Sequence, residues 1–213
     1  MTETVRDQLF GKAGLMSPSC AVKSFTFDSL KSLDSWEVAQ ITSPPLMRNI
    51  GPNLIKIALG FNNLTGNIPD AIGDHCVNVE WIFLADNPGI TGPIPENWSN
   101  LRKLRKLHLY KTGISGPIPS SLFMCATELR TVDFHDTQLS GPIPDSIGQA
   151  TKLQELWLYN TKVSGAIPTS ITKLKQLQLL YLHSTGLTVP DGANKMWFRT
   201  SEDVINFFAL IKK

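Results

Sequence analysis

The sequence predicts a solenoid in which about six copies of one short unit stack side by side. The core residue at the centre of each copy returns at a fixed spacing, in steps of 25, 25, 25, 24 and 24 residues: Leu59, Leu84, Leu109, Phe134, Leu158 and Leu182. A segment rich in glycine and proline follows the leucines of most copies, as at residues 115–119. Such a period indicates a repeat protein, in which each unit buries its apolar face only against its neighbours.

Residues 101–125 illustrate how one copy is expected to fold. Leu104, Leu107 and Leu109 place apolar side chains on one face of a short strand. The glycine and prolines at 116–119 end that strand, because proline has no amide hydrogen and fixes its own φ angle. We expect residues 120–123 to form a short helix or 3₁₀ turn on the outer side.

Two further positions of each copy are expected to face inward. The first is the apolar residue directly before the last proline of each return segment, at Ile68, Ile94, Ile118, Ile143, Ile167 and Val189. The second is a polar residue after the strand, which can bond buried backbone groups: Asn62, Asn87, Thr112, Thr137, Thr161 and Thr185. A hydroxyl offers fewer hydrogen bonds than an amide, so we expect weaker capping in the copies that carry threonine.

This pattern resembles the leucine-rich repeat family, in its plant-type subclass. The family motif, LxxLxLxxNxLxGxIPxxLxxL, is met in copies one to five, and the resemblance covers about two thirds of the chain. It implies an α/β fold, a right-handed solenoid with a parallel β-sheet on its concave side. In this subclass a second short strand lies near the positions of Thr65, Thr91, Ser115, Ser140 and Ser164.

The repeats divide the chain into three parts. We expect an N-terminal segment and cap at residues 1–51, repeats at 52–190, and a C-terminal cap at 191–213 with a helix at about 201–212. Thr200 can cap that helix, with Asp203 three residues later. The apolar residues that follow would lie over the last repeat and close the core.

Composition excludes several classes of protein and partner. The net charge of +2 argues against a nucleic-acid binder, because phosphate backbones select strongly basic surfaces. No apolar run is long enough to span a bilayer, and the N-terminal residues do not read as a signal peptide. Cys20, Cys76 and Cys125 are odd in number and scattered, which favours a reducing, cytoplasmic setting. A secreted protein whose signal had been removed would look the same, and would give meaning to the glycosylation sequons at Asn63 and Asn97.

The residues between the inward leucines are predicted to form columns on the outer face of the sheet, since strands lie about 4.8 Å apart. Aromatic and histidine side chains gather in these columns, and they include all three tyrosines and three of the four histidines. The candidate ligand-binding residues are Trp81, Phe83, His108, Tyr110, Asp133, His135, Trp157, Tyr159, Tyr181 and His183. Exposed aromatic bands usually mark recognition, although packing between neighbouring strands is the alternative.

The same face invites an enzymatic interpretation, which the sequence does not favour. His108 and Asp133 are column neighbours, and Asp133 and His135 share a strand face. Catalysis needs a nucleophile or metal in contact with a base, and no such triad forms around the serine after His183. We therefore expect no catalysis, no metal and no cofactor, and interpret the Asp–His contacts as ordering the surface.

The predicted function is non-catalytic binding of a protein or peptide along the concave face. The family resemblance favours such ligands, but fold alone does not carry function. One alternative is recognition of a cell-wall carbohydrate stacked on Trp157, Tyr159 and Tyr181, or inhibition of a cell-wall-degrading enzyme by that face. A second alternative is a structural spacer or the recognition domain of a larger receptor or effector.

Overall fold

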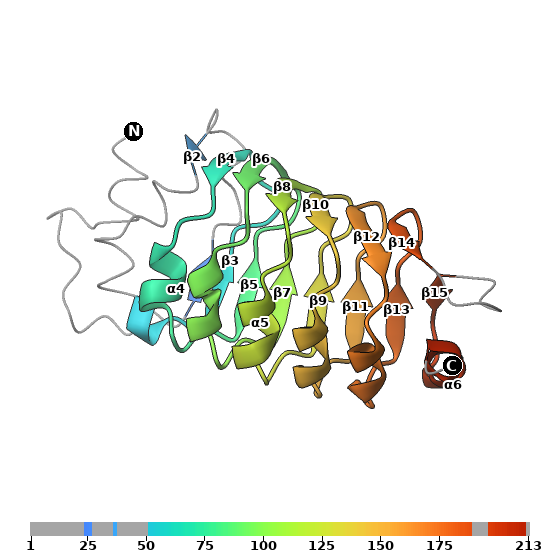
Figure 1. The fold of residues 1–213 in the computed structure, drawn as a ribbon. Helices are drawn as coiled ribbons and strands as arrows, with labels where there is room; N and C mark the ends of the chain where they lie inside the picture. The colour runs from blue at the N-terminus through green and yellow to red at the C-terminus, as the bar shows by residue number, and fades with distance from the viewer. Residues whose placement is uncertain (1–23, 27–35, 38–50, 189–195, 212–213) are drawn as a thin grey trace, which may run out of the picture.

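One short strand from each repeat pairs with its counterpart in the next repeat and builds a first sheet. The computed structural model describes residues 24–26, 36–37, 51–188 and 196–211. The first sheet has eight strands in the order β1 (Ser24–Thr26), β3 (Lys56–Ala58), β5 (Trp81–Phe83), β7 (Lys106–His108), β9 (Thr131–Asp133), β11 (Glu155–Trp157), β13 (Leu179–Tyr181) and β15 (Trp197–Phe198). Within this sheet the odd-numbered strands from β1 to β13 are parallel and in register, which confirms the predicted solenoid (Figure 1).

Each repeat also contributes a second short strand, close to its inward polar residue, and these strands form a second parallel sheet. Its seven strands run in the order β14 (Gly186–Thr188), β12 (Lys162–Ala166), β10 (Gln138–Gly141), β8 (Thr112–Gly116), β6 (Asn87–Gly92), β4 (Leu64–Asn67) and β2 (Trp36–Glu37). These strands contain the positions at which the plant-type pattern implies a second strand, so that expectation is confirmed. The motif glycines in β4 to β12 have φ angles of 77° to 89°, a left-handed conformation that glycine adopts without a Cβ penalty.

Short helices form the third side of the coil. They are η2 (Gly51–Asn53), α4 (Ala71–His75), η3 (Glu96–Asn100), α5 (Ser120–Cys125), η4 (Asp145–Gln149) and η5 (Thr169–Lys173). Helix α5 covers the residues expected to be helical, and its start after Pro119 agrees with the chain break predicted there. Figure 1 shows these helices along the side of the solenoid away from the second sheet.

The core fills the space between the two sheets and the helices. The inward leucines of every described repeat are buried, as are the isoleucines that precede a proline in each return segment, from Ile68 to Ile167. Val189 lies outside the described residues. Trp98 and Phe123, both fully or almost fully buried, fill the core from the helical side.

Among the inward polar residues, Asn87 makes more hydrogen bonds than the threonines do, as expected, whereas Asn62 donates only to Leu59 O and Gly60 O of its own repeat. The Asn87 amide donates to Leu59 O at 2.9 Å and to Leu84 O at 2.8 Å, and its Oδ1 accepts from Leu64 N at 3.0 Å. It therefore joins two repeats. The hydroxyls of Thr112, Thr137, Thr161 and Thr185 each donate only to a carbonyl of their own repeat.

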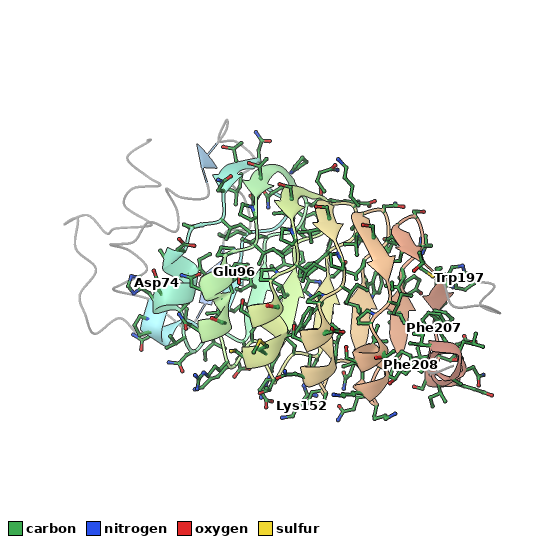
Figure 2. All side chains as sticks on the ribbon, in the orientation of Figure 1. Asp74, Glu96, Lys152, Trp197, Phe207 and Phe208 are labelled. Carbon is green, nitrogen blue, oxygen red and sulfur yellow. The ribbon has the colours of Figure 1, made fainter. Side chains whose placement is uncertain are left out.

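The C-terminal end closes in a way that the repeat pattern did not predict. Strand β15 pairs with β13 in the antiparallel sense, with Leu180 opposite Phe198. Helix α6 (Ser201–Ile211) follows, and Asp203 N donates to Thr200 Oγ1 at 3.1 Å, as expected for the N-cap. Val204, Phe207 and Phe208 of α6 are buried, and Phe207 stacks on Phe198 with ring centroids 4.4 Å apart (Figure 2). The helix therefore caps the last repeat.

At the N-terminal end, both sheets continue past the first complete repeat. Strand β1 pairs with β3, and β2 pairs with β4, in the parallel sense. Part of the expected N-terminal cap thus adds one more turn to the array. The other residues of that segment lie outside the described residues, so the predicted limits at residues 51 and 190 stay predictions.

Replacing Asn87 by threonine should destabilise the solenoid more than losing a threonine hydroxyl. Asn87→Thr would leave the buried Leu64 amide unpaired, at a cost of about 1–3 kcal/mol in the free energy of unfolding. Thr137→Val should cost about 1 kcal/mol, because only one bond within a repeat is lost. Urea unfolding of both variants checks the difference, and equal costs would contradict the bridging role of Asn87.

Candidate functional site

Four aromatic rings stack in a row across neighbouring strands of the first sheet. Each residue lies two positions after the end of β7, β9, β11 or β13, and the ladder runs Tyr110, His135, Tyr159, His183. Successive ring centroids are 4.6, 4.5 and 4.7 Å apart, with interplanar angles of 8°, 9° and 8°. We call these four residues the ring ladder. Adjacent strands lie about 4.8 Å apart, so equivalent side chains reach ring-stacking distance without distortion.

A second row, defined by Phe83, His108, Asp133, Trp157 and Tyr181, lies beside the ring ladder within the strands themselves. Its rings are tilted rather than stacked: Phe83 and His108 are 5.7 Å apart, and Trp157 and Tyr181 are 4.9 Å apart at 33°. The two rows also contact each other, as in the edge contact of Phe83 with Tyr110 at 6.1 Å. The predicted aromatic band is therefore one continuous packed layer.

Asp133 and His135 differ from the expectation that both present their side chains to solvent. Asp133 is 6% exposed and His135 is 8% exposed, because larger rings on neighbouring strands cover them. His135 Nδ1 lies 2.5 Å from Asp133 Oδ1, and His108 Nδ1 lies 3.8 Å from Asp133 Oδ2. The carboxylate therefore orients two imidazole rings, in line with the ordering role expected for these contacts.

The surroundings shift the pKa of three groups in this layer. Burial acts to raise the pKa of Asp133, but hydrogen bonds from His108 and His135 outweigh it, and the pKa is lowered from its ordinary value. The pKa values of the Tyr110 and Tyr159 phenols are raised, first by burial and then by the charges of nearby carboxylates, with Asp133 acting on both. Both phenols are therefore neutral hydrogen-bonding groups at neutral pH.

Trp81 is the most exposed of the ten predicted residues, at 36%. It lies apart from the stacked rings, between Lys56 and Lys106, whose Nζ atoms are 4.7 and 4.6 Å from its ring centroid. The structure thus brings nine of the ten residues into one layer and places Trp81 at its edge. Phe83 also lies directly over Gly60, where a Cβ atom would be 2.0 Å from its ring, so the glycine makes room for this layer.

Three further residues extend the layer and were not among the predicted site residues. Phe61, 53% exposed, lies 5.7 Å from Phe83 at the N-terminal end. Arg199 lies over both Tyr181 and Trp197 at the other end, with its Cζ 6.0 and 5.3 Å from their ring centroids. Phe61 could have been found from its place in an outer column, whereas the contacts of Arg199 depend on the antiparallel strand β15.

Among the residues that the structure describes, no group of three or more His, Cys, Asp or Glu could hold a metal ion. Asp133 and His135 are paired with each other and buried, and the His135 ring is stacked between the rings of Tyr110 and Tyr159. What the layer offers to solvent is ring edges and phenol hydroxyls in a fixed array.

Asp133 should make the stability of the protein depend on pH in the acidic range. Its pKa is lower in the folded state than the value of about 3.9 for an unfolded aspartate, so its contribution is present above that value. The contribution is lost as the pH falls through the folded pKa. Asp133→Asn should therefore lose less stability than wild type between about pH 6 and about pH 3.

Urea unfolding at the two pH values measures this effect. Asp145→Asn, which removes an exposed carboxylate from η4 on the helical side, controls for the loss of one charge. Parallel losses of stability in wild type and Asp133→Asn would contradict the interaction of Asp133 with the two histidines.

The chain was compared with known proteins and structures. A family profile described as Leucine Rich Repeat matches residues 128–150 and 152–174. None of the curated protein sequences compared matches the chain. Among the described residues, no helix is both long enough and apolar enough to cross a membrane.

Several solved receptor structures share this fold. The plant peptide hormone receptor RGFR1 in complex with RGF2 matches with a TM-score of 0.71 at 31% identity, over 84% of this chain and 26% of that one. The PEPR1–AtPEP1 structure matches with a TM-score of 0.66 at 31% identity, over 73% and 21% of the two chains. The Arabidopsis receptor kinase HAESA, in complex with the peptide hormone IDA and the co-receptor SERK1, matches with a TM-score of 0.65 at 30% identity, over 74% and 25%.

The chain therefore spans about a quarter of the length of these receptor structures. Its identity to them is 30% or 31%, and the similarity extends over most of the repeat array. The repeat spacing, the two parallel sheets and these matches together show that the chain belongs to the leucine-rich repeat family, in its plant-type subclass.

Proposed function

We propose that the chain is a non-catalytic binding module that holds a peptide or a protein against the ring ladder and the second row. The observation that carries this proposal is the continuous layer of half-buried rings across strands β5 to β13. Such a layer is preorganised, because its rings are already ordered by their neighbours and lose little freedom on binding. HAESA was solved with the peptide hormone IDA, and RGFR1 is described as a peptide hormone receptor, which supports a ligand of this class.

The stacking geometry favours a peptide over a carbohydrate. A sugar binds an aromatic side chain by covering the face of its ring, but both faces of Tyr159 are occupied, by His135 at 4.5 Å and by His183 at 4.7 Å. The edges and polar tips that stay accessible suit the alternating amides and side chains of an extended peptide. None of the matched structures named above is described as a carbohydrate complex.

A purely structural role accounts for the layer less well. Cross-strand ring pairs do stabilise a sheet, and the contacts of the ladder contribute to its stability. A spacer would gain that stability equally from aliphatic columns, which leave no hydrogen-bonding tips at the surface. The neutral phenols of Tyr110 and Tyr159 are therefore better explained as contacts for a ligand.

The Trp157→Ala, Tyr159→Ala double variant should abolish selection from a random peptide library displayed on phage. Removal of two aromatic anchors from the centre of an interface weakens binding by about a hundredfold or more. The matched control, Val77→Ala with Met124→Ala, truncates two exposed apolar residues on the helical side and should select the same peptides as wild type.

Tyr159→Phe separates recognition from packing, since it keeps the stacked ring and removes only the hydroxyl. We expect it to unfold like wild type and to bind the selected peptides more weakly. Circular dichroism confirms that each variant is folded. If the double variant is folded and still selects the peptides that wild type selects, the binding face has been assigned wrongly.

A further inference from the structure

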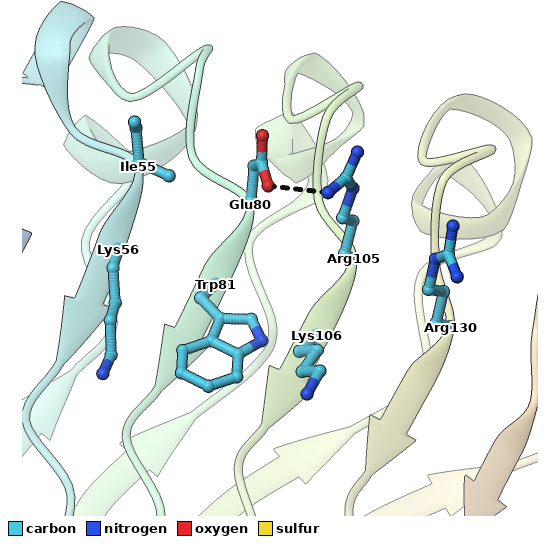
Figure 3. A pocket seen from close by; sticks show the side chains of 7 residues that line it. All are labelled: Ile55, Lys56, Glu80, Trp81, Arg105, Lys106 and Arg130. Atoms are coloured by element: carbon cyan, nitrogen blue, oxygen red, sulfur yellow. Dashed lines mark ion pairs between the residues drawn. The ribbon is translucent and has the colours of Figure 1, made fainter. Parts of the chain in front are cut away.

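A hollow with many cationic side chains lies at the end of the first sheet where strands β3, β5, β7 and β9 begin. The hollow has a volume of about 450 Å³ and is lined by Ile55, Lys56, Glu80, Trp81, Arg105, Lys106 and Arg130. Figure 3 shows these side chains. The lining residues recur with the repeat period, because each strand supplies its first residue or the residue before it. We call the four cations around Trp81, which are Lys56, Arg105, Lys106 and Arg130, the basic corner.

The basic corner carries more positive charge than the whole chain does. Four cations and one carboxylate line the hollow, a local excess of three charges, whereas the net charge of the chain is +2. Glu80 is already paired with Arg105 at 3.1 Å, which leaves the remaining cations uncompensated within the hollow (Figure 3). Arg130 is exposed, and no carboxylate among the described residues lies within ion-pair distance of it.

The two lysines are held in place without being neutralised. Lys56 and Lys106 lie on the strands either side of β5, and their Nζ atoms are 4.7 and 4.6 Å from the Trp81 ring centroid. A cation over an aromatic ring is attracted by the ring and keeps its full charge. Neither lysine makes an ion pair within the described part of the chain. Trp81 therefore positions two ammonium groups for an anion.

Nearby carboxylates determine how far the positively charged surface of the basic corner extends. Glu128 is close enough for Arg105 and Arg130 to contribute to lowering its pKa, but its main partner is Lys152, whose Nζ lies 2.5 Å from its Oε1. Glu155 on β11 is in register with Thr131 and ends the row of cations. The positive surface thus spans only a few strands, too short for the extended contacts by which polyanions such as nucleic acids bind.

We propose that the basic corner binds an acidic segment of a peptide ligand, with two or more aspartate or glutamate side chains close together. Arginine binds carboxylates in a planar, bidentate geometry, and the two lysines add point charges at fixed positions. The remainder of the peptide continues along the ring ladder, which begins on β7, so the acidic segment sets its direction and register. This inference rests on the proposed function, and the test below separates the two.

The test repeats the peptide selection with a second pair of variants. Wild type should enrich peptides with acidic residues clustered toward one end, and Arg105→Ala with Arg130→Ala should lose that enrichment. The matched control, Lys173→Ala with Lys175→Ala, removes the same charge from η5 and the exposed turn after it, and should behave as wild type. Arg130→Glu should shift selection toward peptides with basic residues.

Affinity for one selected acidic peptide supplies a second readout. The Arg105→Ala, Arg130→Ala variant should bind it about tenfold more weakly at low salt, since each exposed ion pair accounts for a few-fold. The difference should shrink at about 0.5 M salt, because screening acts on exposed charges. The control variant should match wild type under both conditions.

Four results would overturn the inference. Peptides selected without acidic enrichment, or an acidic enrichment that survives in the Arg105→Ala, Arg130→Ala variant, would remove the acidic ligand and leave the peptide-binding face intact. A random RNA pool bound more tightly than any selected peptide, and lost in the same variant, would assign the basic corner to phosphates instead. No selection of any peptide by wild type would overturn the proposed function as well.

Discussion

The structure depends on the in-register pairing of one three-residue strand per repeat. Lys56 pairs with Trp81, Trp81 with Lys106, and so on along the array, so a position in one repeat lies directly beside the same position in the next. The buried leucines hold this register, because a slip of one residue would turn them toward solvent. The register in turn fixes which outer side chains meet. The distances of 4.5 to 4.7 Å between the rings of the ladder are close to the usual separation of neighbouring strands, about 4.8 Å.

The close stacking changes what the aromatic residues can do. A single exposed tyrosine offers two ring faces to a ligand, whereas Tyr159 within the ladder offers an edge and a hydroxyl. The same packing buries Asp133, and a buried carboxylate must be hydrogen-bonded to be tolerated. His135 and His108 meet this need, so the charge at the centre of the layer is used to orient rings rather than presented to solvent.

The constant spacing of equivalent residues was sufficient to predict the stacked repeats and the columns of side chains on the outer face of the first sheet. The family pattern predicted the second sheet, and the Thr200 cap with the apolar residues after it predicted helix α6. The repeat spacing identified the strands of the first sheet and the inward polar residues. It also placed Tyr110, His135, Tyr159 and His183 in one column. These features follow from positions that are equivalent by translation, which is the information that a repeated sequence contains.

The features that the sequence did not predict depend on the sizes of neighbouring side chains or on the ends of the array. Asp133 and His135 are buried because the neighbouring repeats carry large rings. The alternating pattern within one strand contains no information about the size of side chains on the next strand. Residues such as Phe61 and Lys111 adopt left-handed φ angles of 58° and 51°, an unusual conformation for side chains of this size. The inter-repeat bonds from Phe61 N to Ala85 O and from Lys111 N to His135 O compensate for it. Arg199 reaches Tyr181 only because β15 reverses direction.

The charges at the two edges of the first sheet differ in sign, and this asymmetry bears on how any ligand can lie. The basic corner occupies the border where the strands begin. At the opposite border, just after the strands end, Asp86 and Asp136 flank Lys111 and leave a net negative charge. Opposite potentials on either side of an aromatic layer select orientation more than they add affinity, because a ligand placed the wrong way round meets like charges. Under the proposed function, the rings would supply contact area in any orientation of the peptide, and the charged borders of the sheet would favour one orientation.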